Sequence, residues 1–366
     1  MARIAEVTIR RLKVPLKVPY KVSLRTFHDF EPLVVELRDS DGRSAWGEAE
    51  IHAGYGGETP KTGWSFCRRL GPLLLGRAPH EAVAQLTPEA AENPQATSIL
   101  LSAAETLAGH PALALEQPLA VPLLAPVHSM DLAKIDDEIE DLLNQGFRTL
   151  KVKVGFDVDT DLHRVAAIQL ATAGRASLRI DANQAFSRTQ GCSFAAALDP
   201  TGIELFEQPC DKADWAANAG VAASSRVPLM LDESIYGLED IERAATIHGV
   251  GFVKLKLKKL GGLNLLIEAL RRIRELGMEP VLGDGTATDI GDWLEACVAR
   301  DTIRNAGEMN GYLKLATPLF TPALPFSEGA LRLPQGYRPE VDRRTIERFA
   351  ITAERFAATQ VAGAAL

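Results

Sequence analysis

The spacing of apolar positions changes at about residue 119. Before this point, strand-like alternation covers residues 4–15, 33–38 and 43–50, and the last two segments flank a hairpin turn signal, Asp39-Ser40-Asp41-Gly42. Apolar residues recur at helical spacing near residues 61–75 and 97–109. The pattern predicts an α+β N-terminal domain over residues 1–118.

After residue 119, short apolar segments alternate with segments of helical periodicity. The predicted strands cover residues 119–127, 149–154, 178–181, 203–207, 229–232, 252–257, 279–283 and 303–307. Helices are expected between them, for example at residues 131–144, 160–173, 237–248 and 264–276. Eight strands with helical crossovers favour a (β/α)8 TIM-like barrel over residues 119–325, with an open doubly wound sheet as the alternative. The segment 326–366 is predicted to complete the N-terminal domain.

Composition narrows the classes of function. The chain has 366 residues, of which 46% are apolar, so it is long enough to bury a large core. A formal net charge of −8 without a basic stripe argues against nucleic acid and anionic membranes as partners. The four cysteines form no C-x-x-C pair, and the sequence contains no signal peptide and no apolar run of membrane-spanning length. These features predict a cytoplasmic protein.

Carboxylates end three consecutive predicted strands. Asp181 ends LRID, Glu207 ends ELFE and Asp232 ends LMLD. Because the active site of a barrel lies at the C-terminal ends of its strands, the three should meet at one rim. Carboxylates so close together repel one another unless a cation joins them, and ligation by oxygen alone suits Mg²⁺. The sequence therefore predicts a magnesium site, and the alternative is three separate carboxylates that cap helices or pair with basic residues.

Lysines alternate along two other predicted strands. Lys151 and Lys153 lie in LKVKV, and Lys254, Lys256 and Lys258 lie in VKLKLKK. Residues two apart on a strand share a face, which we expect to be the barrel interior. Strands two and six lie opposite each other in an eight-stranded barrel, so these lysines would flank a substrate held on the metal. Neighbouring cations and burial would lower the pKa of such a lysine, so that it acts as a base near neutral pH. The alternative is a solvated face of two edge strands.

In chain order, these motifs resemble the enolase superfamily, and within it the muconate-lactonizing enzyme group. The resemblance rests on K-x-K at Lys151, D-x-N at Asp181, E-Q-P at Glu207, D-E-S at Asp232 and K-x-x-K-x-G-G at Lys256. The motifs span about half of the chain, and the hairpin that ends in WGEAE is similar to the family's capping domain. The resemblance implies a modified TIM-like barrel with an N-terminal α+β capping domain, and a homo-oligomer.

The resemblance also implies residue roles. The Mg²⁺ ligands would be Asp181, Glu207 and Asp232. The acid/base residues on opposite faces of the substrate would be Lys153 and Lys256. Lys151 would help to hold the carboxylate of a small-molecule substrate, and Asn183 is a further candidate contact. Other contacts are expected from two N-terminal loops, 17–29 and 50–60. The implied reaction removes a proton α to the substrate carboxylate through an ene-diolate, leading to racemisation or epimerisation of an amino-acid derivative.

Three sites depart from the family pattern. Lys254 stands where relatives more often carry a neutral residue, and it would pair with a metal-ligand carboxylate or compete as the base. Asp284 would provide a polar contact in place of a glutamate that many relatives carry near Ala287. Glu308 and Asn310 stand where dipeptide epimerases carry D-x-D to hold a substrate ammonium, so a dipeptide substrate is not favoured.

Other functions stay open at this point. A cycloisomerase or a dehydratase/lyase of the same superfamily shares the first step. In a different class, a Schiff-base lysine aldolase would attack a carbonyl with a strand-six lysine, and borohydride trapping would detect its imine. No histidine follows His248, which disfavours the histidine-based mechanism of the mandelate-racemase group. The intact set of carboxylates disfavours a non-catalytic scaffold.

Overall fold

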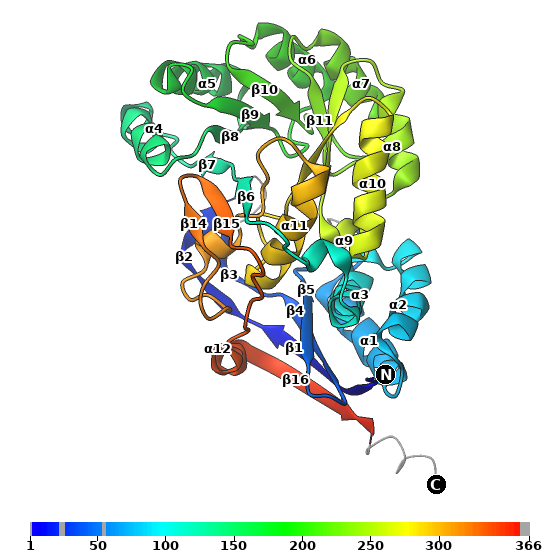
Figure 1. Cartoon of the computed structure of the whole chain (residues 1–366). Helices are drawn as coiled ribbons and strands as arrows, with labels where there is room; N and C mark the ends of the chain where they lie inside the picture. Colours follow the sequence, from blue (N-terminus) through cyan, green and yellow to red (C-terminus); the bar gives the residue numbers. More distant parts are fainter. Residues whose placement is uncertain (1, 22–25, 53–55, 359–366) are drawn as a thin grey trace.

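The computed structural model describes residues 2–21, 26–52 and 56–358, and it shows an N-terminal sheet with its helices beside a larger barrel (Figure 1). Residues 22–25 and 53–55, which belong to the two predicted loops, lie outside the described residues. The expectation of a loop over 17–29 is wrong at both ends. Strands β2 (Val14–Lys21) and β3 (Thr26–Phe30) occupy those ends, because their backbone groups pair with each other in an antiparallel ribbon.

A four-stranded antiparallel sheet forms the N-terminal layer, in the order β16-β1-β4-β5. Its strands are β1 (Ile4–Leu12), β4 (Leu33–Asp39), β5 (Ser44–Ala49) and β16 (Ala350–Ala357). The carboxylate of Asp39 fixes the β4–β5 turn by accepting hydrogen bonds from the backbone N–H groups of Asp41 (3.1 Å) and Arg43 (2.8 Å). The helices of this layer are α1 (Pro60–Leu70), α2 (Pro79–Leu86) and α3 (Pro94–Ala108), and α3 packs along β4 and β5.

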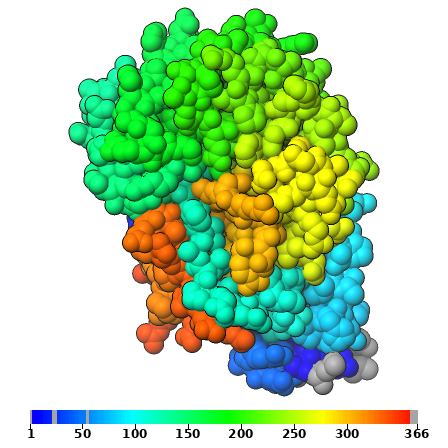
Figure 2. Space-filling model, turned by 45° about the horizontal axis from the view of Figure 1, so that its top comes forward, coloured from blue at the N-terminus to red at the C-terminus, as the bar shows by residue number. Residues whose placement is uncertain are grey.

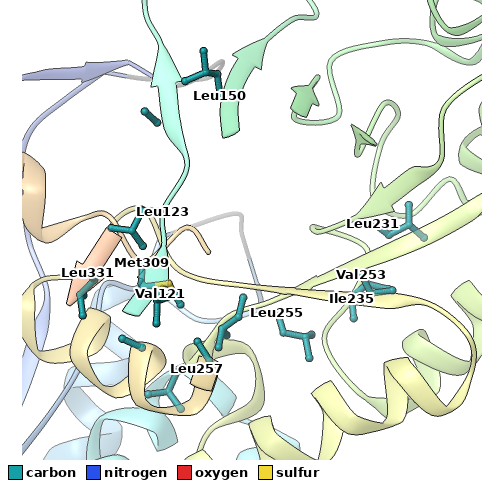
Figure 3. Close-up of a cluster of buried hydrophobic side chains, with 14 of the residues drawn as sticks. Val121, Leu123, Leu150, Leu231, Ile235, Val253, Leu255, Leu257, Met309 and Leu331 are labelled. Atoms are coloured by element: carbon teal, nitrogen blue, oxygen red, sulfur yellow. The ribbon is translucent and has the colours of Figure 1, made fainter. Parts of the chain in front are cut away.

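Seven parallel strands form the wall of the barrel, in the order β13-β12-β11-β10-β9-β8-β7. They are β7 (Ala125–Val127), β8 (Thr149–Lys153), β9 (Ser177–Asp181), β10 (Ile203–Glu207), β11 (Leu229–Leu231), β12 (Val250–Leu255) and β13 (Glu279–Leu282). These ranges lie close to the predicted strands. The core follows from their alternation, because apolar residues such as Leu150 and Val253 pack among buried side chains (Figure 3). The lysines next to them, Lys151 and Lys254, pair with carboxylates inside the barrel.

Helices cover the outside of this wall (Figure 1). They are α4 (Ile135–Asn144), α5 (Val158–Thr172), α6 (Arg188–Ala197), α7 (Trp215–Ser224), α8 (Leu238–Ala245), α10 (Leu263–Glu275) and α11 (Asp289–Thr302). In α10, the buried residues Leu263, Leu266, Leu270 and Ile273 recur every three or four positions and form one apolar face. Burying each of these side chains stabilises the fold by about 2 kcal/mol. None of the described helices is long and apolar enough to cross a membrane.

The first and eighth predicted strands differ from the expectation. The segment 119–127 divides into β6 (Leu119–Pro122) and β7, and the predicted strand 303–307 is reduced to a bridge at Gly307. Gly307 N–H donates to Pro122 O (2.8 Å) and Gly307 O accepts from Leu124 N–H (3.0 Å), while Glu308 N–H donates to Leu282 O (2.9 Å). Through residues 307 and 308 these bonds join β13 to the end of β6 and to Leu124, which directly precedes β7, and they close the barrel, so the open-sheet alternative is wrong. Pro122 cannot donate to a ladder, which limits the pairing at this seam.

Arg179 binds, from inside the barrel, the segment of residues 305–308 that closes it. Its guanidinium is fully buried and pairs with Glu204 at 2.9 Å. It also donates to Ala306 O (2.9 Å) and to Asn305 Oδ1 (3.3 Å). The planar group therefore connects β9 and β10 to the residues that replace an eighth strand.

The C-terminal segment contacts both layers. Strands β14 (Phe326–Ser327) and β15 (Ala330–Leu333) form a sheet with β6, and Figure 2 shows this orange segment against the residues near 119. Helix α12 (Arg343–Phe349) then leads to β16, which pairs with β1. Only the last of these strands joins the N-terminal sheet.

Candidate active site

Three buried carboxylates lie at one rim of the barrel. Asp181 is the last residue of β9 and Glu207 the last residue of β10, and the two are register partners. Asp232 directly follows β11. None of the three is more than 2% exposed. The structure therefore places the candidate metal ligands on consecutive strands, and we call these three residues the carboxylate arc.

Two lysines of β8 contact one end of this arc. Lys151 Nζ lies 2.9 Å from Asp181 Oδ2 and 2.7 Å from Glu207 Oε2. Lys153 Nζ lies 2.5 Å from the same Asp181 oxygen and 2.5 Å from Asn183 Oδ1. The two side chains share the inner face of β8 because they are two residues apart.

Two other lysines contact the opposite end. Lys256 Nζ lies 3.0 Å from Asp232 Oδ2, and Lys259 Nζ lies 2.6 Å from Asp232 Oδ1. Strands β9, β10 and β11 separate β8 from β12. Lys153 and Lys256 therefore stand at the two ends of the carboxylate arc, which is the arrangement needed to reach a substrate from two sides.

The sequence pattern predicted that Lys258 shares a strand face with Lys254 and Lys256, and this prediction is wrong. Lys258 lies beyond β12 in the short helix α9 (Leu257–Leu260). The chain turns there because Leu257 N–H donates to the buried carboxylate of Glu295 (2.7 Å). Lys258 Nζ donates to Glu50 O (3.0 Å), so this lysine links the barrel to the N-terminal layer.

The pKa values of the two candidate acid/base lysines are raised in this arrangement. Burial lowers the pKa of Lys153, but Asp181, Tyr20 and Glu207 together outweigh it and the pKa lies above its usual range. At Lys256, burial is likewise outweighed by the combined attraction of nearby carboxylates, Asp232 first, so its pKa is also raised. The expected lowering of the pKa assumed a metal beside the lysines and stays a prediction; in the arrangement described, each ammonium lies against a carboxylate, which raises its pKa. In return, burial of Asp181 is outweighed by Lys151 and Lys153, which lower its pKa to about 2.

The carboxylate arc offers oxygen donors of the kind that Mg²⁺ prefers. Glu207 Oε2 is buried, and although the Lys151 ammonium lies 2.7 Å away, no described residue meets it with hydrogen-bond geometry. Each carboxylate now faces a lysine, and no three Asp, Glu, His or Cys side chains among the described residues are grouped closely enough to hold an ion. The residues fit Mg²⁺ in chemistry and position, and the carboxylates would have to turn from the lysines towards one another to bind it.

Two of the candidate substrate contacts are engaged with protein side chains. Asn183 accepts from Lys153 and donates through Nδ2 to Glu233 Oε1 (3.1 Å). Asp284 Oδ2 lies 2.6 Å from Lys258 Nζ. Burial of Asp284 is outweighed by Lys258 and Lys256 together, so the pKa of this carboxyl lies below its usual range. Asn183 is thus beside the arc, whereas Asp284 belongs to the linkage through Lys258.

The other two candidates, Glu308 and Asn310, follow the closing segment of the barrel. Glu308 forms ion pairs with Lys151 (3.0 Å) and with Lys254. Asn310 donates through Nδ2 to Leu124 O (2.9 Å), and its Oδ1 accepts from Lys314 Nζ (2.6 Å). Neither side chain resembles the pair of free carboxylates that a substrate ammonium would need.

Sequence reasoning did not assign a site role to Glu233 or Lys259. Glu233 is 3% exposed, and burial together with the adjacent Asp232 raises its pKa to about 7. Burial lowers the pKa of Lys259 to about 8, although Asp232 opposes the shift. The spacing K-x-x-K from Lys256 carried a signal for Lys259, since residues three apart lie on one side of a helical turn. In the sequence, only its position directly after Asp232 could have pointed to Glu233 as a site residue.

Comparisons with known proteins agree with this geometry. A family model described as Enolase C-terminal domain-like matches residues 134–339, more than half of the chain. An L-Ala-D/L-Glu epimerase from Bacillus subtilis is 27% identical over 91% of this chain and 94% of that protein. An o-succinylbenzoate synthase from Geobacillus kaustophilus is 30% identical over 97% of this chain and 98% of that protein. The crystal structure of muconate lactonizing enzyme from Pseudomonas fluorescens, complexed with muconolactone, has a TM-score of 0.86 at 26% identity, over 95% of this chain and 99% of that chain. The protein is therefore an enzyme of the enolase superfamily, in the group that resembles muconate lactonizing enzyme.

Proposed function

We propose that the protein racemises or epimerises an amino-acid derivative by removing the proton α to its carboxylate and returning a proton on either face. The observation that carries this proposal is the position of Lys153 and Lys256 at the two ends of the carboxylate arc. One lysine in its neutral form would take the α-proton, and the electron pair of the C–H bond would remain on the substrate as an ene-diolate. The other lysine, as an ammonium, would donate a proton to the opposite face.

The substrate carboxylate would lie above the carboxylate arc. Asp181, Glu207 and Asp232 would hold Mg²⁺, which supplies positive charge where negative charge grows as the proton leaves. Lys151 would add a donor to the same carboxylate. Burial of Lys151 is outweighed by Asp181 and Glu207, so its pKa is raised well above the usual range and the side chain stays protonated.

The relatives support the proposed class of reaction, proton removal next to a carboxylate, but they differ in the product that follows. They include dipeptide epimerases, an o-succinylbenzoate synthase and a chloromuconate cycloisomerase. A reaction that ends in elimination or ring closure needs one lysine for the shared proton-removal step. The presence of a lysine at each end of the arc therefore favours proton return on both faces.

Exchange of the α-proton in D₂O tests the proposal whatever product the enzyme forms. The panel would contain both enantiomers of N-acyl amino acids, dipeptides and 2-hydroxy acids, with MgCl₂ present. We expect exchange of both enantiomers of at least one amino-acid derivative by the wild-type enzyme. Lys153→Ala should lose exchange of one enantiomer and Lys256→Ala that of the other, each by about 10²–10⁴-fold. The control is Lys61→Ala, at an exposed lysine outside the site.

Three results would contradict the assignment. Absence of exchange across the whole panel would refute the proposed reaction. Retention of exchange on both faces by both lysine variants would refute the two-lysine mechanism. If Lys254→Ala loses one face while Lys256→Ala keeps both, the base is Lys254.

A further inference from the structure

The carboxylate of Glu295 binds the ends of two neighbouring barrel strands. The ladder between β12 and β13 ends at the pair Leu255–Leu282. Two residues beyond each member of this pair, Glu295 Oε1 accepts from Leu257 N–H (2.7 Å) and Glu295 Oε2 accepts from Asp284 N–H (2.8 Å). Glu295 belongs to α11 and is 1% exposed. Its two oxygens therefore satisfy one buried backbone donor from each strand, at the point where the strands diverge.

The peptide group that follows Lys256 is held on both sides. Lys256 is extended (φ −138°, ψ 147°) and Leu257 begins α9, so the chain turns at this peptide group. Its N–H donates to Glu295, and its carbonyl oxygen accepts from Lys259 N–H (3.0 Å). Because a peptide group is planar, holding it sets ψ of Lys256 and with it the direction in which this side chain leaves the backbone.

The rest of α9 has other anchors. Lys258 pairs with Asp284 (2.6 Å), and Lys259 pairs with Asp232 (2.6 Å). These two ion pairs do not depend on the carboxylate of Glu295. Loss of that carboxylate should therefore release the beginning of α9, where the acid/base lysine lies, and leave the remainder of the short helix attached to the barrel.

We propose that Glu295 is a positioning residue for Lys256, because its carboxylate holds the peptide group between β12 and α9 so that this lysine reaches the substrate. The inference rests on the proposed function, since it assumes that Lys256 exchanges a proton with one face of the substrate. Three strands separate β12 from β8, which carries Lys153. Glu295 therefore governs one face of the substrate and leaves the other to Lys153.

Exchange of the α-proton of each enantiomer in D₂O, with saturating MgCl₂, tests the positioning role. Glu295→Gln keeps the size of the side chain but directs an NH₂ donor at one of the two backbone N–H groups. The pH is held above the pKa of Glu295, which burial raises to about 8, so that the wild-type group is a carboxylate. On the face that Lys256→Ala loses, we expect kcat to fall about tenfold to a hundredfold with KM unchanged, because a small misplacement of a reacting group slows the chemical step. Exchange on the Lys153 face should stay close to that of the wild type.

Glu105→Gln is the matched control. Glu105 is 3% exposed and also accepts from two backbone N–H groups, those of Leu263 (2.7 Å) and Asn264 (3.1 Å), at the start of α10. Its replacement should lower the thermal midpoint about as much as Glu295→Gln does, because each removes one acceptor from a buried pair of donors. The ratio of exchange on the two faces should stay that of the wild type.

Amide hydrogen exchange tests the contact without turnover. In the wild-type protein, the N–H groups of Leu257 and Asp284 should exchange slowly, although both lie beyond the end of the ladder. In Glu295→Gln at least one of them should exchange faster, because a carboxamide has a single acceptor oxygen. If Glu295→Gln does not fold, Glu295→Asp replaces it, since the shorter carboxylate does not span both donors and should give the same loss on one face.

Fast amide exchange at both positions in the wild-type protein would overturn the proposal. So would a folded Glu295 variant that slows both faces equally or keeps the full rate on the Lys256 face. Protected amides in a wild-type protein that exchanges no α-proton on any substrate would refute the proposed function and leave the contact of Glu295 with the two strands intact. Wild-type exchange on both faces, with no face-specific loss in the variant, would refute the positioning role alone.

Discussion

The ammonium of Lys254 contacts the carboxylate of Glu308 inside the barrel, where the two side chains are 2% and 8% exposed. Removing one partner of a buried ion pair leaves the other charge without compensation, which costs more than the pair contributes. We expect Lys254→Met to lower the free energy of unfolding by about 3 kcal/mol, measured by urea denaturation. The double variant Lys254→Met/Glu308→Gln should lose less than the two single changes added together.

The exposed pair of Arg332 and Glu328 is the control for this experiment. Arg332→Met should change the stability by less than about 1 kcal/mol, because exposed ion pairs contribute little. Equal losses in the buried and exposed variants would show that Lys254 has no special electrostatic role.

Metal binding provides a second prediction. If Glu207 is a ligand, millimolar MgCl₂ should raise the thermal midpoint of the wild-type enzyme, because a ligand that binds only the native state stabilises it. Glu207→Gln should remove most of this increase, whereas Glu268→Gln at an exposed position should keep it. Calorimetry measures both midpoints, and an unchanged Mg²⁺ affinity in Glu207→Gln would remove Glu207 from the ligand set.

The junction between the two layers predicts a pH dependence of stability. Glu48 of β5 accepts hydrogen bonds from Thr288 N–H (2.7 Å) and Gly291 N–H (2.9 Å) at the start of α11. Burial raises the pKa of this carboxyl to about 7, against about 4.5 when unfolded. The folded state therefore binds more protons between these two values, so stability is fully present below pH 4.5 and is lost as the pH rises to 7.

Glu48→Gln should flatten this dependence, by at most about 3 kcal/mol over the interval. Urea denaturation at several pH values between 4.5 and 7 measures it. Glu116→Gln, at an exposed position, should keep the slope of the wild-type protein. A Glu48→Gln protein with the wild-type slope would show that other groups carry the dependence.

Because Arg179 helps to close the barrel, even its conservative replacement by lysine should destabilise the protein. Lysine carries the charge of arginine but lacks the planar fork that reaches Glu204, Ala306 O and Asn305 together. We expect Arg179→Lys to lower the free energy of unfolding by about 3 kcal/mol, as buried groups lose their partners. Amide hydrogen exchange should also lose protection at residues 307 and 308, whose N–H groups close the barrel.

Arg271→Lys, at an exposed position on α10, is the control and should change neither quantity. Full protection at residues 307 and 308 in Arg179→Lys would show that the backbone bonds close the barrel without the guanidinium.

The sequence by itself determined the strand positions and the carboxylate arc. Alternation and helical spacing are local properties, so they identified β8 to β13 to within a few residues. Asp181, Glu207 and Asp232 could be placed at one rim because parallel strands all end on the same side of a barrel. That inference needs only the chain direction and the strand ends.

Only the tertiary structure decided which charges pair. Lys254 and Glu308 are far apart in sequence, and so are Lys151 and Glu207, so no local pattern could match them. The eighth strand is reduced to a bridge because Gly307 meets Pro122, which cannot donate a ladder hydrogen bond. Which residues meet at this seam depends on how the barrel closes. The raised pKa of Lys153 likewise came from other strands, because the combined attraction of Asp181, which lies 2.5 Å away, and of Glu207 and Tyr20 exceeds the cost of burying the ammonium.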